Sequence, residues 1–122
     1  MGGQANESLP LAGEVALVSG GNAGIGLGMA RGLARAGASV CIWGRRREHN
    51  EEAVESLRAL GAEAEAFECD VAYEDEIRGA FADTIDRFGR VDSCFANAGM
   101  GPGFVPFVDL ELDTWRRSMQ VN

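Results

Sequence analysis

Short, mostly apolar runs alternate with longer amphipathic stretches along this chain. The apolar runs lie at residues 15–18, 39–43, 65–69 and 91–95, and turn-forming residues or charges separate each of them from the next stretch. Runs of this length with such boundaries predict strands. The sequence therefore predicts four strands, with one connecting segment between each and the next.

The connecting stretches repeat apolar residues every three or four positions, which predicts helices with one buried face. The repeating residues are Ile25, Met29 and Leu33, then Val54, Leu57 and Leu60, then Ile77, Phe81, Ile85 and Phe88. Glycines come after these stretches at Gly37, Gly61 and Gly89, where a left-handed residue would end each helix.

Strand, helix and strand in regular succession predict parallel strands in one sheet with helices on its faces, which is an α/β doubly wound fold. After Phe95, a Gly- and Pro-rich loop spans residues 99–106. Asp113 then suits the N-cap of a last helix that carries Trp115 and Met119.

The composition is that of a single globular domain: 122 residues, 46% hydrophobic and 25% charged, with a net charge of −8. All 11 basic residues are arginines, so the chain holds no lysine for a P-loop or a Schiff base. The acidic balance argues against nucleic acid as a partner.

Residues 1–12 lack periodicity and are expected to be a flexible leader, leaving residues 13–122 as the folded part. The opening MGGQANES lacks the charged and apolar regions of a signal peptide, and no stretch is long and apolar enough for a membrane span. We therefore expect a cytoplasmic protein. The cysteines Cys41, Cys69 and Cys94 lack metal-ligand spacing, so we predict buried reduced thiols and no metal site.

The turn after the first strand carries the strongest motif. Gly20, Gly24 and Gly26 come after Ser19 with the spacing G-x-x-x-G-x-G, directly between a predicted strand and a predicted helix. Glycines there allow a tight turn and bring a pyrophosphate close to backbone N–H groups at the helix N-terminus. The alternative is that they only allow close packing of helix and strand. The spacing G-x-G-x-x-G does not fit, because Met29 would stand at its third glycine.

Three motifs together resemble the short-chain dehydrogenase/reductase family. Ser19 to Gly26 is similar to the family's Thr-Gly-x-x-x-Gly-Ile-Gly, with Ser for Thr. Ala96 to Gly99 is similar to its Asn-Asn-Ala-Gly, with Ala for the first Asn, and Asp70-Val71 matches its Asp and apolar residue after the third strand. The motifs come in the family's order, and the resemblance covers residues 13 to 122.

The resemblance implies a Rossmann-like sheet with strand order 3-2-1-4 and a dinucleotide bound at the carboxyl ends of the strands. Asp70 would accept a hydrogen bond from the adenine, or alternatively cap the next helix. Asn97 to Gly99 would run past the adenine-side ribose, or Asn97 would only tie the sheet to the loop. The implied cofactor-binding residues are Ser19, Gly20, Asn22, Gly24, Ile25, Gly26, Arg45, Asp70, Val71, Asn97, Ala98 and Gly99.

The end of the second strand predicts the choice of cofactor. Enzymes that select NAD place an acidic residue there, which binds the ribose hydroxyls and repels a 2′-phosphate. Gly44 takes that position in this chain, and Arg45-Arg46-Arg47 come next. Guanidinium groups suit a phosphate dianion, so we predict NADP(H) in preference to NAD(H). The alternative is a solvated turn whose arginines pair with glutamates of the next helix, and His49 is expected at the surface.

Of the family's catalytic residues, only the Asn that orders the lysine through water has a match, at Asn122. Tyr73, the sole tyrosine, has no lysine partner and is rejected as the catalytic acid/base. The family's Ser and Tyr-x-x-x-Lys would lie beyond residue 122. We therefore expect this chain to be the cofactor-binding half, with its fourth strand as an open edge and no carbonyl reduction by itself.

The resemblance implies an NAD(P)-dependent oxidoreductase that transfers hydride between NADP(H) and an alcohol or carbonyl substrate. It also implies a homo-oligomer, a dimer or a tetramer, for the full-length protein. The alternative is a non-catalytic nucleotide-binding or partner module, should the chain truly end at residue 122. A methyltransferase is a third hypothesis, because Gly24, Gly26 and Gly28 imitate its glycine run, but the chain lacks the acidic residue after the second strand.

Overall fold

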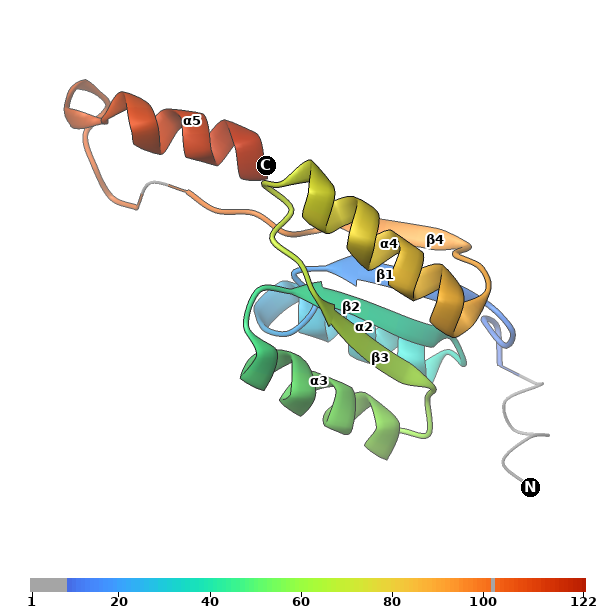
Figure 1. Ribbon diagram of the computed structural model, residues 1–122. Coiled ribbons are helices and arrows are strands. Elements are labelled where there is room, and N and C mark those ends of the chain that lie inside the picture. The colour runs from blue at the N-terminus through green and yellow to red at the C-terminus, as the bar shows by residue number, and fades with distance from the viewer. Residues whose placement is uncertain (1–8, 102) are drawn as a thin grey trace.

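The computed structural model describes residues 9–101 and 103–122. Its strands form one parallel sheet in the order β3-β2-β1-β4 (Figure 1), as predicted. The sheet consists of β1 (Val15–Ser19), β2 (Ser39–Gly44), β3 (Ala64–Glu68) and β4 (Ser93–Ala96). β1 and β2 lie at the centre and are buried almost throughout, because helices cover both of their faces.

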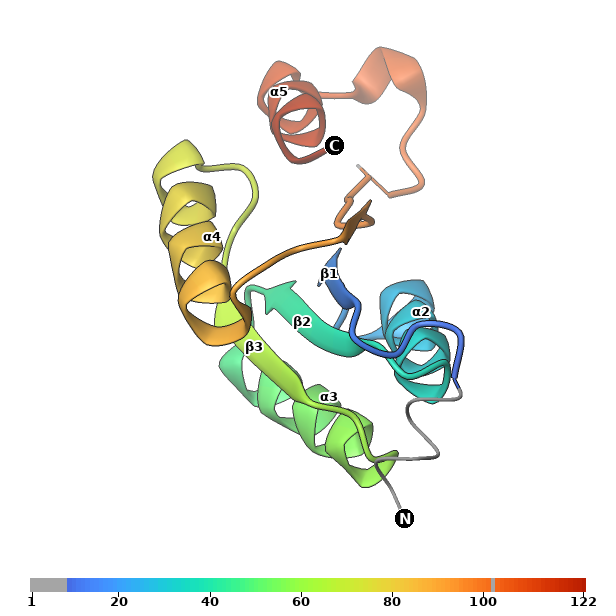
Figure 2. The same cartoon turned by 90° about the vertical axis from the view of Figure 1, so that its right-hand side faces the viewer.

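Two helices cover one face of the sheet and one covers the other (Figure 2). α2 (Gly24–Arg35) and α3 (Arg47–Ala59) pack side by side on the first face, and α4 (Glu74–Phe88) lies on the second. A short 3₁₀ turn, η1 (Phe107–Asp109), leads into α5 (Leu112–Val121), which stands beyond the carboxyl ends of the strands. The chain thus adopts the predicted α/β arrangement.

Each face of the sheet has its own apolar core. Val18, Val40 and Ile42 pack against Leu57 and small residues of α2 and α3 on one face. On the other face the core is formed by Leu17, Cys41, Trp43, Cys69 and Ala80. β1 and β2 contribute to both cores, because successive side chains of a strand point to opposite faces.

α3 buries Val54 and Leu57 as predicted, but the most buried residues of α2 and α4 are small ones next to the predicted large ones. α2 buries Gly26, Ala30 and Ala34, whereas Ile25 is 81% exposed. The predicted Met29 and Leu33 are half-buried and pack against the same core, so the most buried positions lie one residue, or about 100° around the helix, from the predicted ones. In α4 the buried residues are likewise Ala80 and Thr84, next to the predicted Phe81 and Ile85, and Phe81 is exposed. Small residues let a helix approach the sheet closely, so they take the central positions.

Glycines with positive φ come after the first three helices, as predicted. Gly37, Gly61 and Gly89 have φ values of +101°, +89° and +79°. The start of α5 differs from the prediction, because Glu111 is the N-cap and Asp113 lies in the first turn. A carboxylate in the first turn still interacts favourably with the helix dipole.

The folded part begins earlier than predicted. Of the expected leader, residues 1–8 lie outside the described residues, but residues 9–12 form a turn against the end of α2. The backbone N–H of Leu11 donates to Ala36 O at 2.9 Å, and Leu9 packs against Gly37. Residues 9–12 therefore belong to the domain rather than to a flexible leader.

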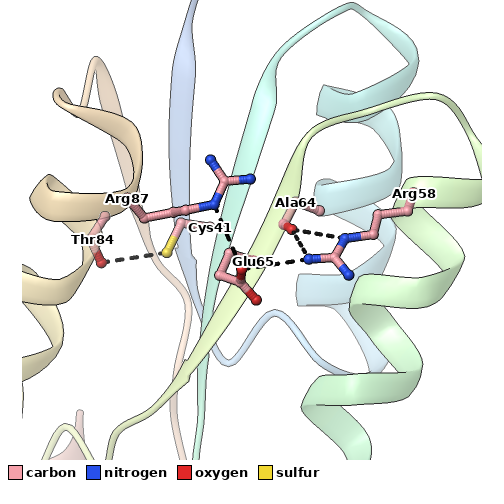
Figure 3. Close-up of polar contacts among 6 residues, drawn as sticks. All are labelled: Cys41, Arg58, Ala64, Glu65, Thr84 and Arg87. Carbon is pink, nitrogen blue, oxygen red and sulfur yellow. Dashed lines mark hydrogen bonds and ion pairs between the residues drawn. The ribbon is translucent and has the colours of Figure 1, made fainter.

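The two edge strands differ in how they are covered. Arg58 donates to the Ala64 carbonyl of β3, and Glu65 lies between Arg58 and Arg87 at 3.5 and 3.6 Å (Figure 3). Such charged side chains discourage another strand from pairing with an edge. β4 pairs with β1 alone and is largely exposed, so Cys94 is exposed and the prediction of three buried thiols is wrong for it.

Candidate functional site

A pocket of about 250 Å³ lies at the carboxyl ends of the strands. The loops after β1, β2, β3 and β4 form its walls, and the end of α5 contributes Val121. Among the residues predicted from the sequence, those that line the pocket are Gly20, Asn22, Arg45, Asp70, Val71, Ala98 and Gly99. The fold therefore brings motifs from four separate loops to one place.

The glycines after β1 allow a close approach between two loops. Gly20 has a φ of +66°, and a Cβ there would lie 3.0 Å from the Ala98 Cα. A Cβ on Gly26 would overlap the Gly20 carbonyl and the Asn97 side-chain amide. No other residue fits either position without moving the backbone, so the glycines serve close packing at this crossing.

The same turn presents the N-terminus of α2. Gly24 has a φ of +55°, Ile25 and Gly26 form the first turn, and the N-cap Ala23 makes no side-chain capping hydrogen bond. The pocket is lined by Asn22 of this turn but not by Gly24, Ile25 or Gly26. The first N–H groups of a helix lack acceptors within it, and they favour an anion.

Ser19 and Asn97 join the ends of β1 and β4. The Asn97 side-chain amide donates to the carbonyls of Ser19 and Gly20, both at 3.2 Å. The Ala98 N–H in turn donates to Ser19 Oγ at 3.1 Å. Both side chains lie behind the pocket wall, so their contacts fix the positions of Gly20 and Ala98, which do line it.

Asp70 lies in the wall after β3. Its Oδ1 accepts the Ala72 N–H at 3.0 Å, and its Oδ2 lies 3.4 Å from Arg117 Nη2 of α5. The N-cap of α4 is Tyr73, so Asp70 is not the residue that caps this helix. The carboxylate is held in place on both sides and borders the pocket.

The basic triplet after β2 is divided between two roles. Arg47 forms an exposed pair with Glu51 at 3.3 Å, as the alternative interpretation expected. Arg45 and Arg46 line the pocket, and neither forms an ion pair with a described residue. His49 is exposed, as expected, but it also borders the pocket. The pocket therefore has a basic side.

The Asn122 side chain fastens the end of α5 beside the pocket. Its Nδ2 donates to the carbonyls of Met100 and Ser118, and its Oδ1 accepts the Met100 N–H at 3.2 Å. Gln120 adds a hydrogen bond to the Ala72 carbonyl at 2.8 Å. Tyr73, by contrast, is exposed at the start of α4.

Cys69 is the thiol in the pocket wall. Burial raises its pKa to about 11, with the carboxylates of Glu76 and Asp70 adding to the effect. The thiol is therefore neutral at physiological pH and is a poor nucleophile. Within residues 9–101 and 103–122 there is no group of three or more metal-ligating side chains and no helix long and apolar enough to cross a membrane.

Two residues beside the pocket were not predicted. Asn50 is buried on α3, and Arg117 reaches Asp70 from α5. Asn50 precedes Val54 by four positions and Leu57 by seven, so it continues their apolar stripe. A polar residue on such a stripe is a usable signal, because a buried amide needs partners. Arg117 leaves no comparable trace in the sequence.

The chain matches the family described as short chain dehydrogenase over residues 14–122. Among curated proteins, a hydroxynaphthalene reductase from Aspergillus fumigatus is 38% identical over 115 residues, covering 93% of this chain and 42% of the relative. The chain thus spans less than half the length of that relative.

Solved structures of a dehydrogenase and of a short-chain oxidoreductase also superimpose on this chain. A xylitol dehydrogenase bound to NAD⁺ superimposes with a TM-score of 0.88 and 34% identity, over 92% of this chain and 43% of that one. A metagenomic short-chain oxidoreductase in complex with NADP gives a TM-score of 0.84 and 32% identity, over 91% and 50%.

Proposed function

This chain belongs to the short-chain dehydrogenase family, and from that premise we propose that it is the cofactor-binding part of an NAD(P)-dependent oxidoreductase acting on an alcohol or carbonyl. The observation that carries the proposal is the convergence of Gly20, Asp70, Arg45 and Gly99 on one pocket at the carboxyl edge of the sheet. Ligands of open α/β sheets bind at that edge, where the strand order reverses.

The pocket fits the adenosine end of a dinucleotide. Its volume of about 250 Å³ is smaller than whole drug-sized sites, which suits part of a dinucleotide rather than all of it. Asp70 offers a fixed carboxylate as acceptor for an amino group, and Val71 offers an apolar wall. The uncapped start of α2 offers N–H groups to the pyrophosphate.

Within this site we propose that NADP(H) is preferred over NAD(H). Gly44 brings no carboxylate to the end of β2, and Arg45 and Arg46 border the pocket without an intramolecular ion-pair partner among the described residues. A phosphate dianion gains charge-assisted hydrogen bonds from such guanidinium groups. The solved relatives carry NAD⁺ in one case and NADP in another, so the preference rests on these side chains.

The nicotinamide ring, when bound, supplies or accepts the hydride. This chain's own residues orient the cofactor: Ser19 and Asn97 hold the loop that faces the pocket, and Asn122 holds the end of α5 against Met100. We propose that Asn122 also serves the proton relay, as the family's Asn does. The relay's other members are absent from this sequence, which contains no lysine.

The preference is tested on the complete gene product by titrating NADPH and NADH against Arg45→Ala and its matched control Arg47→Ala. Loss of one charged contact should weaken NADPH binding about tenfold or more and leave NADH unchanged. Arg47→Ala should change neither, because Arg47 pairs with Glu51. Equal losses for both cofactors in Arg45→Ala would contradict the preference.

The oxidoreductase proposal has its own test. The complete gene product should reduce carbonyl compounds with a nicotinamide cofactor, whereas the purified 122-residue chain should show no turnover. A complete gene product that binds the cofactor but turns over no alcohol or carbonyl would instead support a non-catalytic nucleotide-binding module.

A further inference from the structure

Asn50 is a buried amide whose side chain joins three segments around the basic side of the pocket. It is 4% exposed, on α3, among Ala53, Val54 and Leu57 of the same helix. Its Nδ2 donates to the Gly44 carbonyl at 3.0 Å, and its Oδ1 accepts from Asn22 Nδ2 at 2.9 Å. Both ends of the amide are therefore satisfied, which a buried polar group requires.

These contacts fill the space in front of Gly44. A Cβ built on Gly44 would overlap both Asn50 Oδ1 and Asn22 Nδ2. Gly44 is itself buried at the end of β2, and its carbonyl accepts a second hydrogen bond from the Cys69 N–H at 3.1 Å. The backbone of Gly44 is thus fixed from two sides and cannot easily move to make room for a side chain.

We propose that Asn50 is a specificity-determining residue, which holds Asn22 against Gly44 and so closes the position from which an acidic side chain would select NAD(H). The neutral amide of Asn22 then borders the ribose side of the pocket in place of a carboxylate. It does not repel a 2′-phosphate, and the choice of cofactor is left to Arg45 and Arg46. This inference rests on the proposed nicotinamide function. It adds that the selectivity depends on a residue of α3 that does not line the pocket.

The inference makes positions 44 and 50 interdependent. The Asp side chain of Gly44→Asp must displace the Asn22–Asn50 pair. Overpacking of this kind is expected to raise the cofactor dissociation constants by a factor of about 5 to more than 100. Asn50→Ala removes one of the overlapping side chains and frees Asn22 to turn aside. The acidic side chain should therefore be tolerated only in combination with Asn50→Ala.

The experiment is a double-mutant cycle on the complete gene product, comparing wild type, Gly44→Asp, Asn50→Ala and the double variant by titration with NADPH and NADH. Gly44→Asp alone should weaken the binding of both NADPH and NADH about tenfold or more. The double variant should recover NADH binding to within about threefold of wild type and should still bind NADPH poorly, because the new carboxylate repels the phosphate. A merely structural role for Asn50 would not restore one cofactor selectively.

A second, smaller substitution keeps the inference testable should Gly44→Asp fail to fold. Gly44→Ala introduces only the overlapping methyl group, and Asn50→Ala should rescue its cofactor binding too. Val54→Ala is the matched control, because it removes buried volume from the same helix without touching Gly44 or Asn22. It should lower the unfolding temperature and leave the ratio of the two dissociation constants unchanged.

Two results would overturn the inference. The first is that Gly44→Asp or Gly44→Ala binds the cofactors equally well whether or not Asn50 is replaced. The second is that the double variant recovers binding of neither NADH nor NADPH. The proposed NADP(H) preference fails by a different result, namely tighter binding of NADH than of NADPH by the wild type. The coupling between positions 44 and 50 can be read in either case, so the two failures are distinguishable.

Discussion

The Thr84 hydroxyl connects helix α4 to two central side chains of the sheet. Thr84 is fully buried and donates to the Ala80 carbonyl at 2.7 Å. Its oxygen accepts the Trp43 indole N–H at 3.0 Å. The Cys41 sulfur lies 3.4 Å from the same oxygen (Figure 3). Because the hydroxyl proton is used on Ala80, the Cys41 S–H must be the donor in that last contact.

Thr84→Val should lower the free energy of unfolding by about 1 to 3 kcal/mol, because it preserves the shape but leaves the buried Trp43 N–H without its acceptor. Thr84→Ser keeps the hydroxyl and should lose less. Urea unfolding of the complete gene product measures both. If Val were tolerated better than Ser, packing of the methyl group rather than the hydrogen bond would be the main contribution.

Cys41 gives a second prediction, on alkaline pH. Burial raises the pKa of its thiol from 9.0 to about 11. Between these values the unfolded chain loses this proton before the folded protein does, so the free energy of unfolding falls as pH rises from about 9 to about 11. Cys41→Ala should show a shallower decline across that range in unfolding measurements. An identical pH dependence for the two proteins would contradict the raised pKa.

Residues whose places depend on the local backbone could be predicted from the sequence, and residues whose roles depend on distant side chains could not. The glycines after β1 and Asp70 after β3 stand at fixed places relative to a strand end, so motif and pattern located them. Arg117 meets Asp70 across 47 positions in the chain. Asn50 depends on Gly44 lacking a side chain. The apolar stripe of α3 signals that Asn50 is buried, but the partners of Asn50 and Arg117 result from how α3 and α5 are placed, which no local pattern specifies.

At the scale of elements, periodicity located the helices and, in α3, the buried residues Val54 and Leu57, but it missed the most buried positions of α2 and α4. α2 and α4 both carry large apolar residues at helical spacing, yet Ala30, Ala34 and Ala80 occupy the central contacts with the sheet. Close approach of a helix to a parallel sheet depends on small side chains as much as on apolar ones. A pattern that weighs only hydrophobicity is therefore off by one position around the helix.

Helix α4 offers a matched pair of glycines for testing what backbone conformation contributes. Gly79 lies inside the helix and Gly89 is its left-handed C-cap, and a Cβ would meet no atom within 4 Å at either site. Gly79→Ala should raise the free energy of unfolding by about 0.5 to 1 kcal/mol, and Gly89→Ala should lower it by about 1 to 2 kcal/mol. Chemical denaturation measures both changes. Effects of the same sign would contradict the prediction that backbone conformation decides the effect at each glycine.

For the molecule as a whole, the net negative charge and the exposed apolar surface have opposite effects on association between copies of the chain. The net charge of −8 disfavours association between copies of this chain. The segment from residue 104 to residue 119, however, exposes large apolar side chains at Phe104, Phe107, Val108, Leu112, Trp115 and Met119. β4 adds an open edge next to that segment in sequence. Apolar side chains gathered in this way favour contacts with other protein surfaces.

The purified 122-residue chain should therefore self-associate as its concentration rises, and more strongly at high salt, because salt screens the repulsion between acidic copies. Sedimentation velocity measures this directly. Phe107→Ser combined with Val108→Ser should shift the equilibrium toward monomer, since these side chains are 79% and 88% exposed. Ile25→Ser, which removes an equally exposed apolar residue beside the glycine turn, serves as the control and should not. If the control reduced association as much as the double variant, general surface hydrophobicity rather than the segment before α5 would drive the contact.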